Sequence, residues 1–234
     1  MHEYQIQAIG VIHSPYKEKF GTPRQSGLIP VQSKIELFSP YNQIEAFKEI
    51  KGFSHIWINF VFHQALSNQW KPQVRPPRLG GNEKVGVFAS RSPFRPNNLG
   101  QSVVRFIGIE QKQKKLIVVI EGGDLIDGTP IVDIKPYIPY VDSILTASGG
   151  FAGKSPEATL QVGFSTEAEK QLALIPNDQE FKRFLEQVLS LDPRPAYKNI
   201  QDTHEYGLNL DGYNIRWQVN NSQIQVMSIL PVTV

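Results

Sequence analysis

The fold class is decided by residues 101–121, which read QSVVRFIGIEQKQKKLIVVIE. Residues 101–110 and 116–121 are rich in β-branched side chains, which favour strands, and the polar residues between them suit a turn. This stretch therefore predicts an antiparallel hairpin. Shorter strands are expected over residues 4–12, 34–38, 56–62 and 85–89, and a series of antiparallel strands indicates a β-barrel or a β-sandwich.

Two further patterns concern the elements around these strands. Ser39-Pro40 is typical of a helix start and Gly52 of a helix end, and three apolar residues between them share one helical face. A packed helix is therefore expected over residues 40–51. Residues 56–62 are almost all apolar and do not alternate with polar ones, which predicts a strand buried on both faces.

The overall composition is that of a globular protein. The chain has 234 residues, 40% of them hydrophobic, which is enough for one large domain or two small ones. Its apolar runs are too short to cross a bilayer and its N-terminus lacks the pattern of a signal peptide, so a cytoplasmic protein without a membrane partner is expected. The absence of cysteine excludes disulfides, thiol nucleophiles and Cys-ligated metal centres.

The net charge is only +2, but it is unevenly distributed. Residues 1–150 hold 17 Lys and Arg against 12 Asp and Glu, and residues 71–105 hold seven basic residues against one acid. Such a local excess attracts polyanions. The loop 70–84 mixes Lys and Arg with Trp70, which suits RNA phosphates and a stacked base. Its arginines, Arg75 and Arg78, are candidate substrate-binding residues.

A stiff basic loop follows the expected strand 85–89 and reads Arg91-Ser92-Pro93-Phe94-Arg95-Pro96-Asn97-Asn98. The two prolines fix φ at their own positions, and Pro96 also biases Arg95 toward an extended conformation. A guanidinium binds a carboxylate or a phosphate through two parallel hydrogen bonds, and a stiff loop lowers the ordering cost of binding. An ordinary solvated turn is the alternative, but two arginines braced by two prolines favour an anion-binding site.

Residues 121–137, EGGDLIDGTPIVDIKPY, form the second candidate site. The glycines let the backbone approach a ligand closely, and Asp127-Gly128 is typical of a tight turn. Asp133, Lys135 and Tyr137 follow at alternate positions and would share one face of a strand. An acid, an ammonium and a phenol side by side would handle a proton or hold a ligand. An ordinary amphipathic strand explains the same pattern equally well.

His55 and His63 lie an even number of residues apart, so they would share one face of an extended strand. A metal centre needs a third ligand at a suitable spacing, which the sequence does not offer, so no metal is expected. His63 and Gln64 are instead expected at a strand end, where they would line a pocket or satisfy local backbone groups.

The composition changes at residues 148–156, SGGFAGKSP, where small residues indicate a linker. Its glycine spacing is one residue short of a phosphate-binding loop, which argues against a nucleoside triphosphatase. Helices are expected from residue 166 and after Asn177, the second with an apolar stripe, and a hairpin over 213–232. The expected organisation is an N-terminal domain (1–147), a linker (148–164) and a small C-terminal α+β domain (165–234).

Several motifs, taken in order, resemble a known family. Beside the arginine loop and residues 127–137, the chain contains Ser14-Pro15-Tyr16-Lys17, Gly52-Phe53-Ser54-His55-Ile56-Trp57, Arg75-Pro76-Pro77-Arg78-Leu79-Gly80-Gly81 and Asp192-Pro193-Arg194-Pro195-Ala196-Tyr197. Together they resemble the TsaA/YaeB proteins, the TrmO tRNA methyltransferases. The resemblance implies an α+β, mainly β fold with an N-terminal antiparallel β-barrel in place of a Rossmann domain, and a homodimer. In agreement, the chain has no Gly-x-Gly-x-x-Gly motif opening a βαβ unit.

The same resemblance implies an S-adenosylmethionine-dependent enzyme that methylates N6 of threonylcarbamoyl-adenosine at position 37 of tRNA. Motif matching assigns the cofactor contacts to Gln25, Ser26, Gly27, His63, Gln64, Arg91, Asp124 and Leu125. Three positions depart from the family pattern, since Ser26 and Asn98 stand where proline is common and Gln101 replaces an apolar residue.

A mechanism can be written on this basis. The sulfonium is already a good leaving group, so positioning is the main task, and removing the proton of the acylated nitrogen should help. Asp133 is the candidate base, with Lys135 and Tyr137 orienting the substrate. Arg91 would bind the cofactor carboxylate, and Arg95 or Arg194 would bind an RNA phosphate. Tyr197 is a further candidate substrate-binding residue. The alternatives are a non-catalytic RNA-binding or cofactor-sensing module and a small-molecule methyltransferase or hydrolase.

Overall fold

A computed structural model describes residues 2–66, 70–156, 160–194, 204–220 and 223–232. The chain divides into two compact units, and neither is continuous in sequence. The first comprises Met1–Ser14, Arg24–Val74 and Lys84–Ala147, and the second comprises Pro15–Pro23, Arg75–Glu83 and Ser148–Val234. In the part of the chain that is described, no helix is long and apolar enough to cross a membrane.

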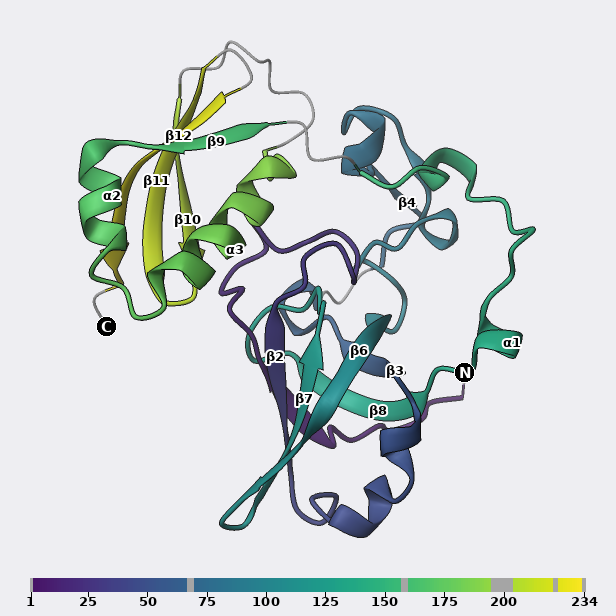
Figure 1. Ribbon diagram of the computed structural model, residues 1–234. Helices are drawn as coiled ribbons and strands as arrows, with labels where there is room; N and C mark the ends of the chain where they lie inside the picture. The colour runs from purple at the N-terminus through teal and green to yellow at the C-terminus, as the bar shows by residue number, and fades with distance from the viewer. Residues whose placement is uncertain (1, 67–69, 157–159, 195–203, 221–222, 233–234) are drawn as a thin grey trace. The chain divides into compact units, whose positions relative to one another are not determined.

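The first unit is built on six strands joined in the order β1-β2-β7-β6-β3-β8 (Figure 1). The order closes on itself because β8 pairs with β1, and each of the six pairings is antiparallel. The predicted hairpin is confirmed as β6 and β7. The strands are β1 (Gly10–His13), β2 (Gln32–Leu37), β3 (His55–Val61), β6 (Leu99–Lys112), β7 (Lys115–Glu121) and β8 (Pro130–Pro136).

The core of the first unit lies on one side of these strands, where alternate residues of each strand are buried. In β3, Ile56, Ile58 and Phe60 are buried, whereas Trp57 and Asn59 between them are half-buried. The expectation that this strand is buried on both faces is therefore wrong. The outer Trp57 packs against Tyr137, at 6.0 Å between ring centroids, and its Nε1 donates a 2.9 Å hydrogen bond to Asp142. The apolar residue at this position therefore belongs to a half-covered outer face.

Two other expected elements of the first unit are replaced. The helix expected over 40–51 is absent, and the described chain instead forms two short 3-10 turns, Ile44–Phe47 and Ile50–Gly52. Glu49 between them has a left-handed backbone (φ 67°), which a continuous helix does not allow. The strand expected over 85–89 shortens to β5 (Val85–Gly86), which pairs with β4 (Gln73–Val74).

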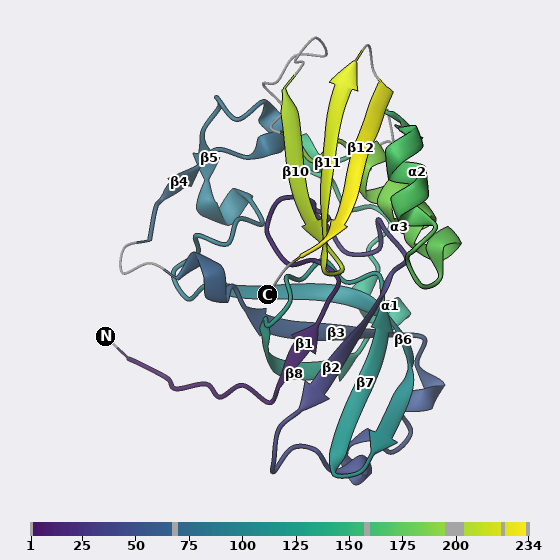
Figure 2. The same cartoon turned by 90° about the vertical axis from the view of Figure 1, so that its left-hand side faces the viewer.

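The second unit contains a four-stranded sheet in the order β10-β11-β12-β9, with its helices on one side (Figure 2). The expected helical stripe is confirmed, because Phe181, Phe184, Leu185, Val188 and Leu189 are all buried. The C-terminal hairpin is confirmed as β11 and β12. The elements are β9 (Gln161–Phe164), α2 (Thr166–Leu172), α3 (Asp178–Ser190), β10 (Glu205–Leu210), β11 (Tyr213–Asn220) and β12 (Gln223–Pro231).

Two strands of this sheet were not expected from the sequence. Residues 161–164, expected in the linker, form β9, which runs parallel to β12. A four-residue strand containing Gly163 is too short to stand out from a flexible connection. β10 was also missed, because Gly207 and Asn209 interrupt its apolar residues. The boundaries expected for the two domains stay predictions.

Candidate cofactor-binding site

Three connections of the first unit meet at one end of the strand ring. They follow β1, β3 and β7 and lead into β2, β6 and β8, and the antiparallel registers place Gln32 opposite Glu121 and Val61 opposite Leu99. Each residue assigned to the cofactor by motif matching lies on one of these connections. The fold therefore brings to one end of the ring segments that are up to a hundred residues apart in sequence.

Backbone hydrogen bonds fix the first of these connections to the third. The Gly27 N–H donates to the Gly122 carbonyl (2.8 Å), and the Gly122 N–H donates to the Val31 carbonyl (3.0 Å). Gly122 has φ 80°, and a Cβ at this position would lie 3.3 Å from the Gly27 Cα. Glycine is required here because the two backbones touch in a conformation that other residues rarely adopt.

Side chains complete the contact between the connections. The guanidinium of Arg91 donates to Gln25 Oε1. The carboxylate of Asp124 accepts a 2.7 Å hydrogen bond from Ser102 Oγ and one from the Ser26 backbone. We call Gln25, Ser26, Arg91, Ser102 and Asp124 the loop-end cluster.

The carboxyl group of Asp124 sits in an unusual electrostatic environment. Burial raises its pKa above the ordinary value, and this effect exceeds the opposing hydrogen bonds from Ser102 and Ser26 and the charge of Arg91. A largely desolvated carboxylate near an exposed guanidinium is suited to a ligand that carries both a positive and a negative group.

His63 and Gln64 lie in a 3-10 turn, His63–Ala65, directly after β3. The turn is held to the arginine loop by Asn98, whose Nδ2 donates to the Ala65 carbonyl (3.2 Å) and to the Pro93 carbonyl (2.8 Å). The Asn98 carbonyl in turn accepts from the Phe62 N–H (2.8 Å). Asn98 is 9% exposed and has a left-handed φ of 50°, which asparagine tolerates better than most residues.

Two residues assigned by sequence have side chains that contact other parts of the first unit. Arg95 donates to the carbonyls of Ser90 (2.7 Å) and Val87 (3.3 Å), so its guanidinium closes its own loop. The expectation that it reaches for an RNA phosphate is not supported by this geometry. Leu125 is buried in the core of the first unit, which leaves its backbone, and not its side chain, for a ligand contact.

The Asp133–Lys135–Tyr137 strand is not part of the loop-end cluster within one chain. Asp133 and Lys135 are exposed on the outer side of β8, and Asp133 accepts a 3.4 Å hydrogen bond from Asn59. The strand runs away from the loop end, so Tyr137 lies about 23 Å along it from Pro130, and its N–H donates to the His55 carbonyl. Asp133 borders a surface hollow of about 520 Å³ that is otherwise lined mainly by apolar residues.

The substrate-binding residues expected in the second unit have mixed outcomes. Arg75 and Arg78 are exposed, and Arg78 donates to the Lys154 carbonyl. Arg194 is 3% exposed and forms a two-pronged ion pair with Asp192, with contacts of 2.8 and 2.9 Å. Arg194 is therefore enclosed by its own unit, which corrects the expectation that it binds an RNA phosphate. Tyr197 lies outside the described residues.

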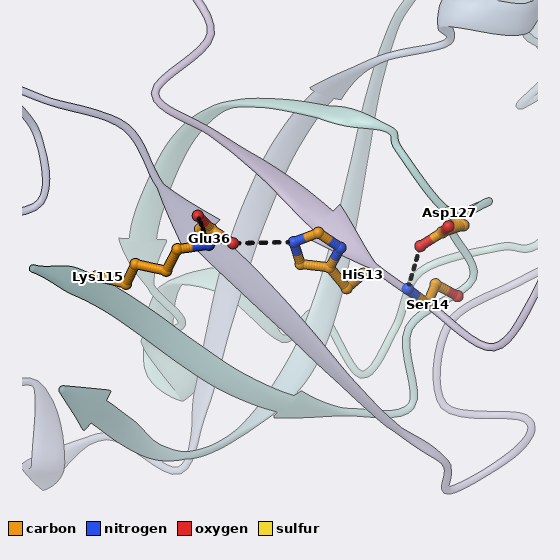
Figure 3. A network of polar contacts seen from close by, with 5 residues as sticks. All are labelled: His13, Ser14, Glu36, Lys115 and Asp127. Atoms are coloured by element: carbon orange, nitrogen blue, oxygen red, sulfur yellow. Dashed lines mark hydrogen bonds and ion pairs between the residues drawn. The ribbon is translucent and has the colours of Figure 1, made fainter. Parts of the chain in front are cut away.

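A second polar network ties β1 to its neighbours (Figure 3). The Ser14 N–H donates to the Asp127 carboxylate (2.8 Å), so the expected Asp127-Gly128 turn is anchored to the end of β1. Glu36 binds both Lys115 Nζ (2.8 Å) and His13 Nε2 (3.2 Å). The hydrogen bond from Lys115 is the largest cause of the lowered pKa of Glu36. The network joins β1 to β2, β7 and the connection before β8, on which Asp124 lies.

Sequence reasoning missed two residues at this site. Ser102 looks like an ordinary polar residue of a strand, and Asn98 looks like a turn residue. The one available signal was that Asn98 departs from the proline common in the resembling family. Among the residues that the structure describes, no group of three His, Asp or Glu side chains is placed to hold a metal ion.

The class of protein follows from the loop-end cluster together with comparison to known proteins. A closed antiparallel ring whose loops gather an acid, a guanidinium and exposed backbone defines a ligand-binding domain unlike the parallel Rossmann fold. Residues 11–143 match the tRNA-methyltransferase O N-terminal domain, and residues 157–232 match the TrmO C-terminal domain. The chain belongs to the TrmO family, which confirms the resemblance.

Known relatives agree with this assignment. The chain is 44% identical to the tRNA (adenine(37)-N6)-methyltransferase of Escherichia coli, with 99% of this chain and 100% of that protein covered. It is 41% identical to a putative S-adenosylmethionine-dependent methyltransferase of Pseudomonas aeruginosa, with 92% of each covered. A crystal structure of TrmO from P. aeruginosa superposes with a TM-score of 0.79 at 33% identity, covering 99% of both chains. The mainly β expectation is confirmed.

The loop-end cluster fits S-adenosylmethionine. This cofactor carries a carboxylate, an ammonium and a sulfonium, and the cluster offers the exposed guanidinium of Arg91 and the half-buried carboxylate of Asp124. The backbone at Gly27 is also open, since a Cβ built there would meet no atom within 4 Å. Close approach of a ligand to this backbone is therefore possible.

Proposed function

We propose that the chain is an S-adenosylmethionine-dependent tRNA methyltransferase that acts on N6 of threonylcarbamoyl-adenosine at position 37, in the cytoplasm. Relatives named tRNA (adenine(37)-N6)-methyltransferase support the reaction class. The observation that carries the proposal is the loop-end cluster, where four of the eight residues assigned to the cofactor (Gln25, Ser26, Arg91 and Asp124) join through hydrogen bonds or charge. The ring of strands would be the β-barrel that the family resemblance implies.

The residues of the chain would bind and orient the cofactor. When bound, S-adenosylmethionine supplies an activated methyl group on a sulfonium. Arg91 would pair with its carboxylate, and Asp124, held by Ser102, would pair with its ammonium. The His63–Ala65 turn, braced by Asn98, would close the remaining side of the site.

The proton on N6 needs an acceptor, and Asp133 remains our proposed base. Asp133 is exposed, and β8 carries it away from the loop end. The proposal therefore requires a homodimer in which Asp133 of one copy faces Arg91 of the other. Lys135 and Tyr137 would orient the substrate from the same strand.

Subunit complementation tests this arrangement. The Arg91→Ala and Asp133→Asn variants should each lose activity, by about 10²–10⁴-fold for the base. If the site is shared across a two-fold axis, random mixing of the two variants gives one intact site in four, so about a quarter of the activity returns. No return of activity on mixing, or a monomer by sedimentation, would refute the shared site.

A transfer assay tests the function itself. The protein is incubated with S-adenosylmethionine labelled in its methyl group and with tRNA that does or does not carry threonylcarbamoyl-adenosine. Label incorporated only into the modified tRNA supports the proposal. Cofactor binding without any labelled tRNA would support the non-catalytic module, and labelled small molecules would support a small-molecule methyltransferase.

A further inference from the structure

An exposed aromatic cluster of the first unit takes no part in the loop-end cluster. It consists of Trp70 and Phe88, whose rings contact each other, and Phe94, which lies beside Lys71, the residue that follows Trp70. The three side chains are 50%, 71% and 38% exposed. The rings of Trp70 and Phe88 are stacked, with centroids 6.2 Å apart and planes 27° apart. Single exposed apolar residues are common on protein surfaces, whereas neighbouring exposed aromatic rings indicate a contact surface.

The exposure of Phe88 is fixed by the turn that carries it. Val87 and Phe88 lie in a 3-10 turn (Val87–Ala89), in which Val87 is buried and Phe88 is exposed. The Val87 carbonyl accepts hydrogen bonds from the Ser90 N–H (3.2 Å), the Ser90 hydroxyl (2.9 Å) and Arg95 (3.3 Å). A turn held by three donors keeps the ring of Phe88 in water at little ordering cost.

Cations accompany these rings. Lys71, which is exposed, places its Nζ 5.9 Å from the Phe94 centroid. The Arg95 guanidinium stays bonded to its own loop and adds positive charge 5.8 Å from the Phe88 centroid. Residues 71–74 and 84–105, which belong to the first unit, contain five basic residues and no acid. Aromatic rings interleaved with cations are the feature by which proteins bind single-stranded nucleic acid, the rings stacking on bases and the cations attracting phosphates.

We propose that Trp70, Phe88 and Phe94 form a base-stacking platform for an unpaired segment of the RNA substrate. A protein partner could bind these rings through apolar contacts alone and would not need the positive charge beside them. The charge therefore favours RNA as the partner. The inference rests on the proposed function and deepens it, because it names the part of the RNA that the first unit holds. A single-stranded loop offers unstacked bases, which a duplex does not.

The test compares two substitutions of one ring. Phe88→Leu keeps the apolar volume but removes the aromatic face, and Phe88→Trp enlarges that face. The ligand is an unmodified anticodon stem–loop RNA, and binding is measured by fluorescence anisotropy in the absence of cofactor. We expect Phe88→Leu to weaken binding roughly 5- to 150-fold, the range of one lost base stack, and Phe88→Trp to bind as well as the wild type. Tyr140→Leu, which changes an exposed ring elsewhere in the unit, should have no effect.

Salt dependence and oligomeric state complete the test. Phe88→Leu should leave the slope of log K against log salt unchanged, whereas Lys71→Gln should reduce it by about 0.7–0.9 for each lost phosphate contact. Wild-type affinity in the Phe88→Leu variant, an equal loss of affinity for a duplex RNA, or conversion of a dimer into a monomer would overturn the platform. If the wild type methylates tRNA but Phe88→Leu binds the stem–loop normally, the platform fails and the proposed function stands.

Discussion

Replacing Asn98 with glycine gives a quantitative test of how the cofactor site is held together. Glycine accepts the left-handed backbone at this position (φ 50°), so the change removes the side chain without imposing strain. Two hydrogen bonds disappear, to the Pro93 and Ala65 carbonyls. Each contributes about 0.5–1.5 kcal/mol, so we expect the free energy of unfolding to fall by about 1–3 kcal/mol.

The assay is thermal unfolding by calorimetry, with cofactor affinity measured separately at a temperature where both proteins are folded. A loss of this size should lower Tm by roughly 2–12 °C in a chain of this length. Releasing the His63–Ala65 turn from the arginine loop should also weaken cofactor binding. The matched control is Asn97→Ala, an exposed neighbour that should stay within about 0.5 kcal/mol. Unchanged stability and unchanged cofactor affinity in Asn98→Gly would refute the reasoning.

Four further predictions rest on individual contacts. Because the pKa of Asp124 is raised by burial, cofactor binding should strengthen as pH rises through that raised pKa, and calorimetric titration should show no such rise for Asp124→Asn. By the same shift, the Asp124 carboxyl group should favour the folded state at acidic pH and lose this contribution as pH rises. Gly100→Ala should destabilise the first unit by about 1–3 kcal/mol in denaturant unfolding, since the new Cβ would lie 2.3 Å from the Phe60 ring. Asp192→Ala should cost about 3–5 kcal/mol in urea unfolding, because it leaves the guanidinium of Arg194 buried without this partner; a loss below about 1 kcal/mol would contradict that.

The sequence predicted well the features that depend on local pattern. The hairpin of β6 and β7, the buried stripe of α3 and the C-terminal hairpin all follow from periodicity, because each periodic face is the face that packs. The prediction of a helix over residues 40–51 was wrong because of the backbone at one residue. The apolar residues of this segment do have helical spacing, but the left-handed backbone of Glu49 interrupts the segment. The spacing of apolar residues does not predict such a backbone conformation.

The candidate site also combines residues that sequence motifs indicate with contacts that only the tertiary structure shows. Motif matching assigned Gln25, Ser26, Arg91 and Asp124 to the cofactor, but no local pattern could show that these residues meet, since this depends on strand order. Arg194 shows the opposite failure, because a rigid Asp-Pro-Arg-Pro turn resembles a binding loop whether its arginine faces solvent or its own aspartate. Burial of a charge is a property of tertiary packing.

Because the strands of the ring are antiparallel, their connections alternate between its two ends. The binding loops lie at one end, and the turn between β6 and β7 lies at the other. Lys112 pairs with Lys115, and Gln113 beside them takes a left-handed backbone at the tip. This tip belongs to the end of the ring remote from Asp124. A fluorophore or a short peptide tag grafted there would report on the enzyme while leaving its chemistry undisturbed.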